Sequence, residues 1–162
     1  MNPAFKKGGT ITAANSSSIS DGGSALVLMK ESDAKARGFK PLARIVAHST
    51  HAQLPAEFTI APIGAVEKVL KKADWNKDDV DLYEINEAFA VVSMLAISEL
   101  GLDADKVNVN GGACALGHPI GSSGSRILVT LLYALKNAGK SKGVASLCIG
   151  GGEATAIAVE MI

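Results

Sequence analysis

From residue 42 onward the chain alternates short apolar runs that favour strands with longer runs that favour helices. Such alternation is typical of an α/β fold, in which helices cover the faces of a largely parallel sheet. The last two strands follow each other without a helix, which favours an antiparallel pair there. We therefore predict an α/β fold built on a mixed sheet with helices on both faces, in the order βαβαβαββ. The predicted strands are 42–47, 80–85, 107–109, 143–149 and 155–161, and the predicted helices are 63–73, 88–100 and 122–138.

The N-terminal part of the chain has a different pattern, because small residues dominate positions 8–24. We expect a loop there and a short buried strand over 25–29. A helix of about one or two turns should follow, capped by Ser32 and ended by Gly38. Pro41 then interrupts the pattern. The chain is thus predicted to divide into a segment of residues 1–41 and a main domain of residues 42–162.

Two of the predicted helices are apolar around most of their circumference. The runs 88–97 and 127–135 contain almost only apolar side chains. A helix on the outside of a sheet needs only an apolar stripe, so a helix that is apolar all round lies between two layers. The chain has strands for one sheet, and bare helices would leave a patch larger than soluble monomers tolerate. We therefore predict a second layer that residues outside this chain supply.

Charge and cysteine content narrow the class of protein. Sixteen basic and sixteen acidic residues cancel, so nothing favours nucleic acid or a membrane as a partner. Cys114 and Cys148 are too few for a disulfide framework, and they lack metal-ligand spacing to each other and to the histidines. Residues 1–7 lack the apolar run of a secretion signal. A cytoplasmic location is predicted, with a eukaryotic organelle left open.

The most informative run chemically is the glycine-rich segment 110–125, which carries His118 just before an apolar helix. Glycines let a backbone approach a ligand closely. Imidazole, with a reference pKa of roughly 6.5, suits proton transfer near neutrality. A lone histidine is usually structural, but this setting favours a functional one.

A second run joins Cys148 to the three glycines 150–152. At the carboxyl end of a strand, a thiol beside free glycine N–H groups suits acyl transfer through sulfur. A buried, inert thiol is the equally weighted alternative. Cys114 lies among small packing residues, and we interpret it as structural.

Polar residues follow the predicted strand 80–85. Asn86 either caps the next helix or orients a water or a carbonyl in a site, and Glu87 suits a helix start. His48 and His51 fall in a predicted polar loop without a partner at suitable spacing, so we place them on the surface.

Together these residues resemble the thiolase family, which comprises acetyl-CoA acetyltransferases and 3-ketoacyl-CoA thiolases. The resemblance covers essentially the whole chain and implies the C-terminal half of the thiolase fold, with residues 1–41 as a remnant of the preceding region. The segments that carry it, in the family's order and spacing, are 12–22, 86–89, 110–121 and 148–152.

The resemblance implies roles for four residues. His118 would deprotonate a nucleophilic cysteine, and Cys148 would exchange a proton with the second acetyl group. Asn86 would hold a water that forms one oxyanion hole with His118, and the N–H of Gly150 would contribute to another. The implied reaction is acyl transfer between acyl-CoA molecules, in which two acetyl-CoA give acetoacetyl-CoA and CoA, or the reverse. Two oxyanion sites allow an enolate to form without a strong base.

The resemblance also implies substrate contacts. Ser17 and Ala13 correspond to positions along the pantetheine arm of coenzyme A, and Phe89 to a wall of the acyl pocket. The coenzyme A thioester is the substrate, and no covalently bound cofactor or metal is expected. The chain departs from the family's common residues at Ala14, Ser18, Ser20 and Phe58.

One departure is larger. The family's acylated cysteine lies in the N-terminal half, and neither Cys114 nor Cys148 corresponds to it. The isolated chain is therefore predicted to be inactive, with an N-terminal thiolase half or another copy covering its inner helices in a homo-oligomer. Two alternatives stay open: a two-chain thiolase whose partner supplies the cysteine, and a non-enzymatic module for binding or assembly. A third alternative is a relative of the ketoacyl synthases, but the run 148–152 argues against it.

Overall fold

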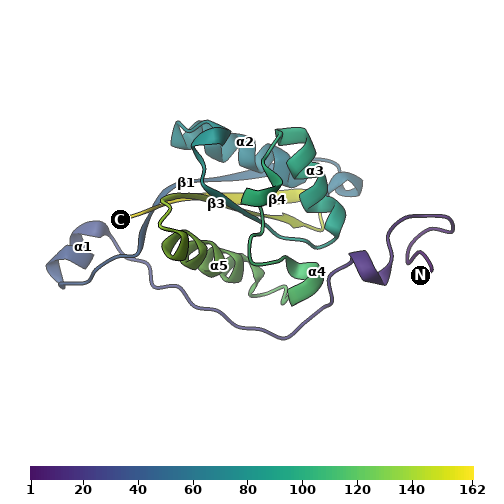
Figure 1. Cartoon of the computed structure of the whole chain (residues 1–162), viewed down its shortest axis with the longest axis horizontal. Helices are drawn as coiled ribbons and strands as arrows, with labels where there is room; N and C mark the ends of the chain where they lie inside the picture. The colour runs from purple at the N-terminus through teal and green to yellow at the C-terminus, as the bar shows by residue number, and fades with distance from the viewer.

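The computed structural model describes all 162 residues and centres on a four-stranded sheet (Figure 1). Its strands lie in the order β1-β4-β3-β2. The β1–β4 and β3–β4 pairs are antiparallel and the β2–β3 pair is parallel, which confirms the predicted mixed sheet. The strands are β1 (Ala43–Ala52), β2 (Leu82–Ile85), β3 (Lys142–Ile149) and β4 (Glu153–Met161).

Helices cover both faces of this sheet, as predicted. Figure 1 shows α2 and α3 on one face and α5 on the other, with α1 set apart from the sheet. None of them combines the length and hydropathy that a membrane span needs. The helices are α1 (Glu31–Ala36), α2 (Ala61–Ala73), α3 (Ala90–Leu100), α4 (Ala113–Leu116) and α5 (Ser123–Ala138).

Each face of the sheet has its own apolar core. Between the sheet and α2 and α3, Val66 and Val92 pack with Tyr83 of β2. On the other face, Leu131 of α5 packs in a second cluster with Leu82 of β2. Successive strand residues point to opposite faces, so the fully buried run of β2 contributes to both cores. This strand is therefore fixed from two sides just before the polar residues that follow it.

Two predicted strands are absent. Residues 107–109 form no strand, because Asn108 has a left-handed φ of 51° and only Val107 makes a single bridge with Tyr83. Residues 25–29 are also not a strand, since their backbone makes no hydrogen bond with any strand of the chain. The order of the main domain is therefore β1-α2-β2-α3-α4-α5-β3-β4 and not the predicted βαβαβαββ.

Two smaller predictions also need correction. Helix α1 begins after Lys30, whose side chain makes no capping hydrogen bond, and Ser32 lies inside the helix. Strand β1 runs to Ala52, so His48 and His51 lie in a strand and not in a loop. His48 is exposed, but His51 is half-buried, and its Nε2 lies 3.1 Å from Oε1 of Gln53.

The all-round apolar character holds for α3 but not for α5. Helix α3 buries only Val92, Ser93 and Ala96, and it leaves Met94 64% exposed. Helix α5 has a one-sided buried face, and Tyr133 on its other side is exposed. The expectation of a bare apolar helix therefore applies to α3.

An extended segment of residues 21–29, here called the N-terminal strap, runs alongside α5 toward α1 (Figure 1). No backbone N–H or C=O of the strap makes a hydrogen bond within the chain. It is held by side chains: Ser24 Oγ lies 2.7 Å from Ser122 Oγ and 2.5 Å from Ser125 Oγ, and Leu26 packs against the α5 core.

We expect thermolysin to make its first cut in the strap, because proteolysis needs backbone that is free of hydrogen bonds. Val27 and Leu28, which are 88% and 66% exposed, are the apolar residues that this protease recognises. Mass spectrometry of a time course identifies the cut. Replacing both residues by aspartate should slow this cut selectively. A first cut within residues 42–162 would contradict the expectation.

Candidate active site

The site lies where β2 and β3 end side by side. Asn86 follows β2 directly, and its N–H donates to the carbonyl of Ser146 in β3 (3.0 Å). Cys148 comes two residues later in β3. Because the two strands are parallel, their carboxyl ends share one edge of the sheet, which is where α/β folds place ligands.

Asn108 holds the end of β2 in position. Its Oδ1 accepts from the N–H of Ile85 at 2.8 Å, and its Nδ2 donates to the Ile85 carbonyl at 2.9 Å. The amide thus replaces the neighbouring strand that is absent there. The sequence analysis did not identify Asn108 as a residue that supports the site. An asparagine between two valines fits the alternation of a strand, so nothing local indicated another role.

His118 lies beside Asn86. The imidazole Nε2 is 3.4 Å from Nδ2 of Asn86, and Nδ1 is 2.6 Å from Oγ of Ser123. The Ser123 hydroxyl has one proton, which it donates to the Pro119 carbonyl at 3.0 Å. With its proton used in this way it accepts from His118, and on that basis we assign the imidazole proton to Nδ1. Nε2 is left with a lone pair, as a general base requires.

Electrostatics also keep His118 neutral. Burial lowers the pKa of its imidazole, and the positive charge of Arg126 lowers it further. A neutral imidazole is the form that can take up a proton.

Cys148 is 8% exposed and belongs to the core on the α2 and α3 side. Phe58 and Phe89 pack against the same cluster, with their rings edge to face at 6.1 Å between centroids. Burial raises the pKa of the Cys148 thiol. No hydrogen bond joins the Cys148 thiol to His118 or Asn86.

Gly150 lies in the turn that joins β3 to β4, and it is exposed. Its N–H donates to no group of the chain. An unpaired N–H two residues after Cys148 can donate to a developing oxyanion.

Residues before the strap form one wall of the site. The N–H and Oγ of Ser17 both donate to the carbonyl of Ala88, at 3.1 and 2.9 Å. The His118 N–H donates to the carbonyl of Ser18 at 2.9 Å. Ser17 therefore lies next to Phe89, whereas Ala13 is exposed in a 3-10 turn farther out.

Two charged residues behind Asn86 were missed from the sequence. Arg126 of α5 approaches Oδ1 of Asn86 with its Nη2 at 3.5 Å. Glu84 of β2 is 2% exposed. Burial raises the pKa of its carboxyl to about 7, while the charge of Arg126 lowers it and that of Glu87 raises it. Arg126 could have been found from its spacing in the sequence. It lies three residues after Ser123 at the start of a helix, so both side chains lie on the same helix face.

Cys114 is held by Glu87 outside this arrangement. Its N–H donates to Oε2 of Glu87 at 3.2 Å, and its Sγ lies 3.9 Å from the Glu87 carbonyl. Burial and the Glu87 carboxylate raise the pKa of the Cys114 thiol. These contacts agree with its interpretation as a structural residue.

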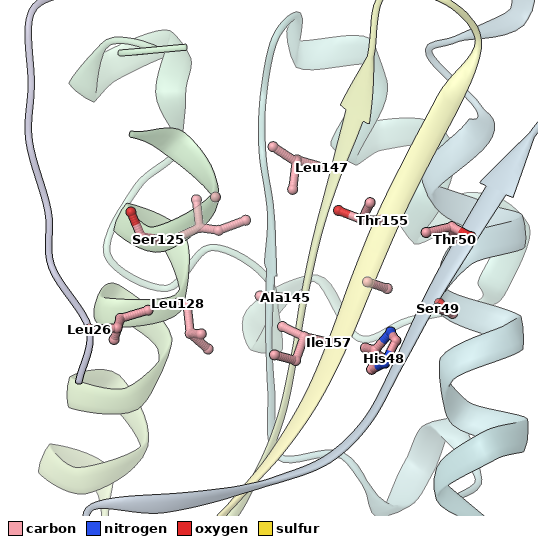
Figure 2. A pocket seen from close by; sticks show the side chains of 13 residues that line it. Leu26, His48, Ser49, Thr50, Ser125, Leu128, Ala145, Leu147, Thr155 and Ile157 are labelled. Atoms are coloured by element: carbon pink, nitrogen blue, oxygen red, sulfur yellow. The ribbon is translucent and has the colours of Figure 1, made fainter. Parts of the chain in front are cut away.

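A hollow of about 360 Å³ lies elsewhere, between α5 and the sheet. Figure 2 shows Leu128 on one side of it and Leu147, Ile157 and His48 on the strands opposite. None of the site residues lines this hollow. It marks a part of the sheet face that α5 does not cover.

Comparison with known proteins identifies the family. The C-terminal domain of the thiolase family matches residues 39–161, and the family's N-terminal domain matches residues 1–32. An acetyl-CoA acetyltransferase of Thiocystis violacea is 53% identical over 162 residues, which are 100% of this chain and 41% of that protein. The cytosolic acetyl-CoA acetyltransferase of Mus musculus is 53% identical over 152 residues, covering 94% of this chain and 38% of its own length.

Solved structures agree. The acetyl-CoA acetyltransferase of Bacillus anthracis superposes with a TM-score of 0.97 at 50% identity, covering 99% of this chain and 41% of that one. Human mitochondrial 3-ketoacyl-CoA thiolase in complex with CoA superposes with a TM-score of 0.91 at 40% identity, with 99% and 41% covered. The chain thus spans about two fifths of the length of these relatives. It belongs to the thiolase family and carries that family's C-terminal domain.

Proposed function

We propose that the chain supplies the base and the acid–base thiol of a thiolase site that transfers acyl groups between acyl-CoA molecules. The reaction is the joining of two acetyl-CoA to acetoacetyl-CoA and CoA, or its reverse. His118 is the base that activates a nucleophilic thiol, and Cys148 exchanges the proton of the second acetyl group. Asn86 and the N–H of Gly150 stabilise oxyanions. The observation that carries this proposal is the position of His118, whose Nε2 lies 3.4 Å from the Asn86 amide while its Nδ1 lies 2.6 Å from the Ser123 hydroxyl.

The front of the site suits a coenzyme A thioester. Ser17 lies next to Phe89, which we place at the acyl pocket. We therefore propose that Ser17 contacts the pantetheine arm next to the acyl group, and that Ala13 contacts this arm farther out. Phe89 and Phe58 form an apolar wall suited to a short acyl group. The solved relatives from human mitochondria and from Ascaris suum were crystallised with coenzyme A, which supports this substrate class.

The chain by itself is proposed to lack turnover. Its two thiols, Cys114 and Cys148, both have pKa values raised by burial. An activated nucleophile has a lowered pKa, because the thiolate is the reactive form. The attacking thiol therefore comes from the remainder of a thiolase architecture.

The part of a thiolase that this chain lacks is also the partner that we infer for the uncovered face of the sheet. The hollow beside α5 is lined mainly by apolar side chains, and the relatives carry more than half of their length outside the part that this chain matches. Segments of that portion would bury Leu147 and Ile157, which are half-buried in the chain. We place the assembled enzyme in the cytoplasm, as named for the mouse relative.

The test is acetoacetyl-CoA cleavage with and without the portion of the Escherichia coli acetyl-CoA acetyltransferase that this chain does not match. We expect no cleavage by the chain alone and cleavage by the assembled pair, whose formation is verified by co-purification. His118→Ala and Cys148→Ala should each lower kcat of the pair by at least about 100-fold, the scale of lost acid–base catalysis. Cys114→Ser is the matched control.

Turnover by the chain alone would contradict the missing nucleophile. An assembled but inactive pair would contradict the proposed reaction. Full activity of His118→Ala in the pair would contradict the role of the histidine.

A further inference from the structure

The side chain of Asn86 is buried, and its two ends have different partners. It is 2% exposed. Its Oδ1 lies 3.5 Å from Nη2 of Arg126, and its Nδ2 lies 3.4 Å from Nε2 of His118. These contacts are long, but they are the only partners of this buried amide in the chain, and catalytic hydrogen bonds are often long before substrate binds.

Arg126 determines which end of the amide faces which partner. A guanidinium has only donors, so the atom that faces it must be the amide oxygen. The NH2 group then points at His118. The opposite orientation would place two sets of N–H donors against each other in a buried site, at a cost that no other contact of Asn86 offsets.

Glu84 is a buried acidic residue whose carboxyl is influenced by the charge of Arg126. Oε1 of Glu84 and Nε of Arg126 are buried without hydrogen-bond partners. The charge of Arg126 favours the ionised form of the Glu84 carboxyl against its burial and the nearby Glu87. No hydrogen bond or ion pair joins the two groups, so the place of the guanidinium beside the amide rests on its own contact with Asn86.

The orientation of the amide matters for the proton on His118. With the NH2 group pointing at it, Nε2 must present its lone pair, while Nδ1–H donates to Ser123. If the amide were reversed, its oxygen would face Nε2. That arrangement favours the tautomer with the proton on Nε2, which cannot act as a base at that nitrogen.

We propose that Arg126 is a positioning residue that orients the Asn86 amide and thereby keeps Nε2 of His118 free of its proton. The use of Nε2 as a base rests on the proposed function. The orientation of the amide and the tautomer do not, so they can be tested without substrate.

The test is the ¹⁵N chemical shifts of the His118 ring in the labelled full chain, at a pH where the imidazole is neutral. We expect the Nδ1–H tautomer to dominate in the wild type. In Arg126→Met the population with the proton on Nε2 should rise several-fold. Arg126→Lys should keep the wild-type tautomer, because an ammonium also has only donors. Arg44→Met, at an exposed arginine of β1, is the matched control.

Asn86→Asp gives a second measurement that does not depend on Arg126. Its carboxylate has no NH2 group, so the proton should move to Nε2. An unchanged tautomer in folded Arg126→Met would overturn the proposal. If Arg126→Met does not fold, as judged by circular dichroism, an unchanged tautomer in Asn86→Asp would overturn it instead. A tautomer that responds, together with an assembled enzyme that is indifferent to His118→Ala, would refute the proposed function but support the positioning role.

Discussion

Replacing Leu131 by alanine is expected to lower the free energy of unfolding by about 3–5 kcal/mol, the range found for buried leucines. Leu131 is fully buried in α5. It lies directly over the backbone of Gly143, since a Cβ built there would be 2.9 Å from its Cδ1. A strand backbone in the middle of a sheet cannot move to fill the space, so the lost side chain leaves a cavity. Urea denaturation monitored by circular dichroism measures the change.

The matched control is Leu116→Ala in α4, where the leucine is 56% exposed. This variant should change stability by less than about 1 kcal/mol, because little apolar surface is uncovered. The urea concentration at the midpoint of unfolding should be lower for Leu131→Ala than for the wild type. The slope of the unfolding free energy against urea concentration should stay the same. Equal effects of the two variants would show that α5 is not packed on the sheet as described.

Gly152→Ala is expected to destabilise the chain by at least about 2 kcal/mol, because two effects add at this glycine. Gly152 has a φ of 98°, in the left-handed region that disfavours side chains. A Cβ there would lie 2.5 Å from the carbonyl oxygen of Gln53. This backbone cannot move away easily, since the Gln53 N–H donates to the Gly152 carbonyl at 3.0 Å. The same denaturation measurement applies.

Gly150→Ala is the control for this substitution in the same turn. A Cβ at Gly150 meets nothing within 4 Å, and its φ is not in the left-handed region. The variant should therefore stay within about 0.5 kcal/mol of the wild type. If Gly150→Ala were the more damaging of the two, the described turn between β3 and β4 would be wrong.

The fold was predictable where the spacing of apolar residues fitted only one kind of secondary structure. The apolar stripe of α2 and the closing pair of strands β3 and β4 were located from the sequence to within two residues. Periodicity failed at 107–109, where alternation of valine and asparagine imitates a strand. The side chain of Asn108, and not a backbone ladder, makes the contacts with Ile85.

The prediction of a strand at 25–29 failed for another reason. Alternating or continuous apolar residues favour an extended backbone, and the strap is extended, but a strand also requires a partner that this chain does not place there. The pattern of apolar residues indicates which backbone conformation a segment favours. It does not show whether another strand lies beside that segment.

The candidate site was predictable in its reacting groups but not in their support. His118, Asn86 and Cys148 stand in runs rich in glycine or at strand ends, where function leaves a local signal. Ser123 and Arg126 look like ordinary residues of a helix's first turns. Their contacts with His118 and Asn86 arise only when α5 packs against the end of β2, which is tertiary information.

The way the strap is held has a consequence for the wall that contains Ser17. Ser17 donates twice to the Ala88 carbonyl and Ile19 makes a single bridge with His118. The next fastening is Ser24, whose hydroxyl meets the first turn of α5. Residues 20–23 are therefore a short span between two fastened ends, and the far end depends on the hydroxyls of Ser24, Ser122 and Ser125. Loss of the Ser24 fastening would lengthen the free span and raise the entropy that a ligand must remove on binding.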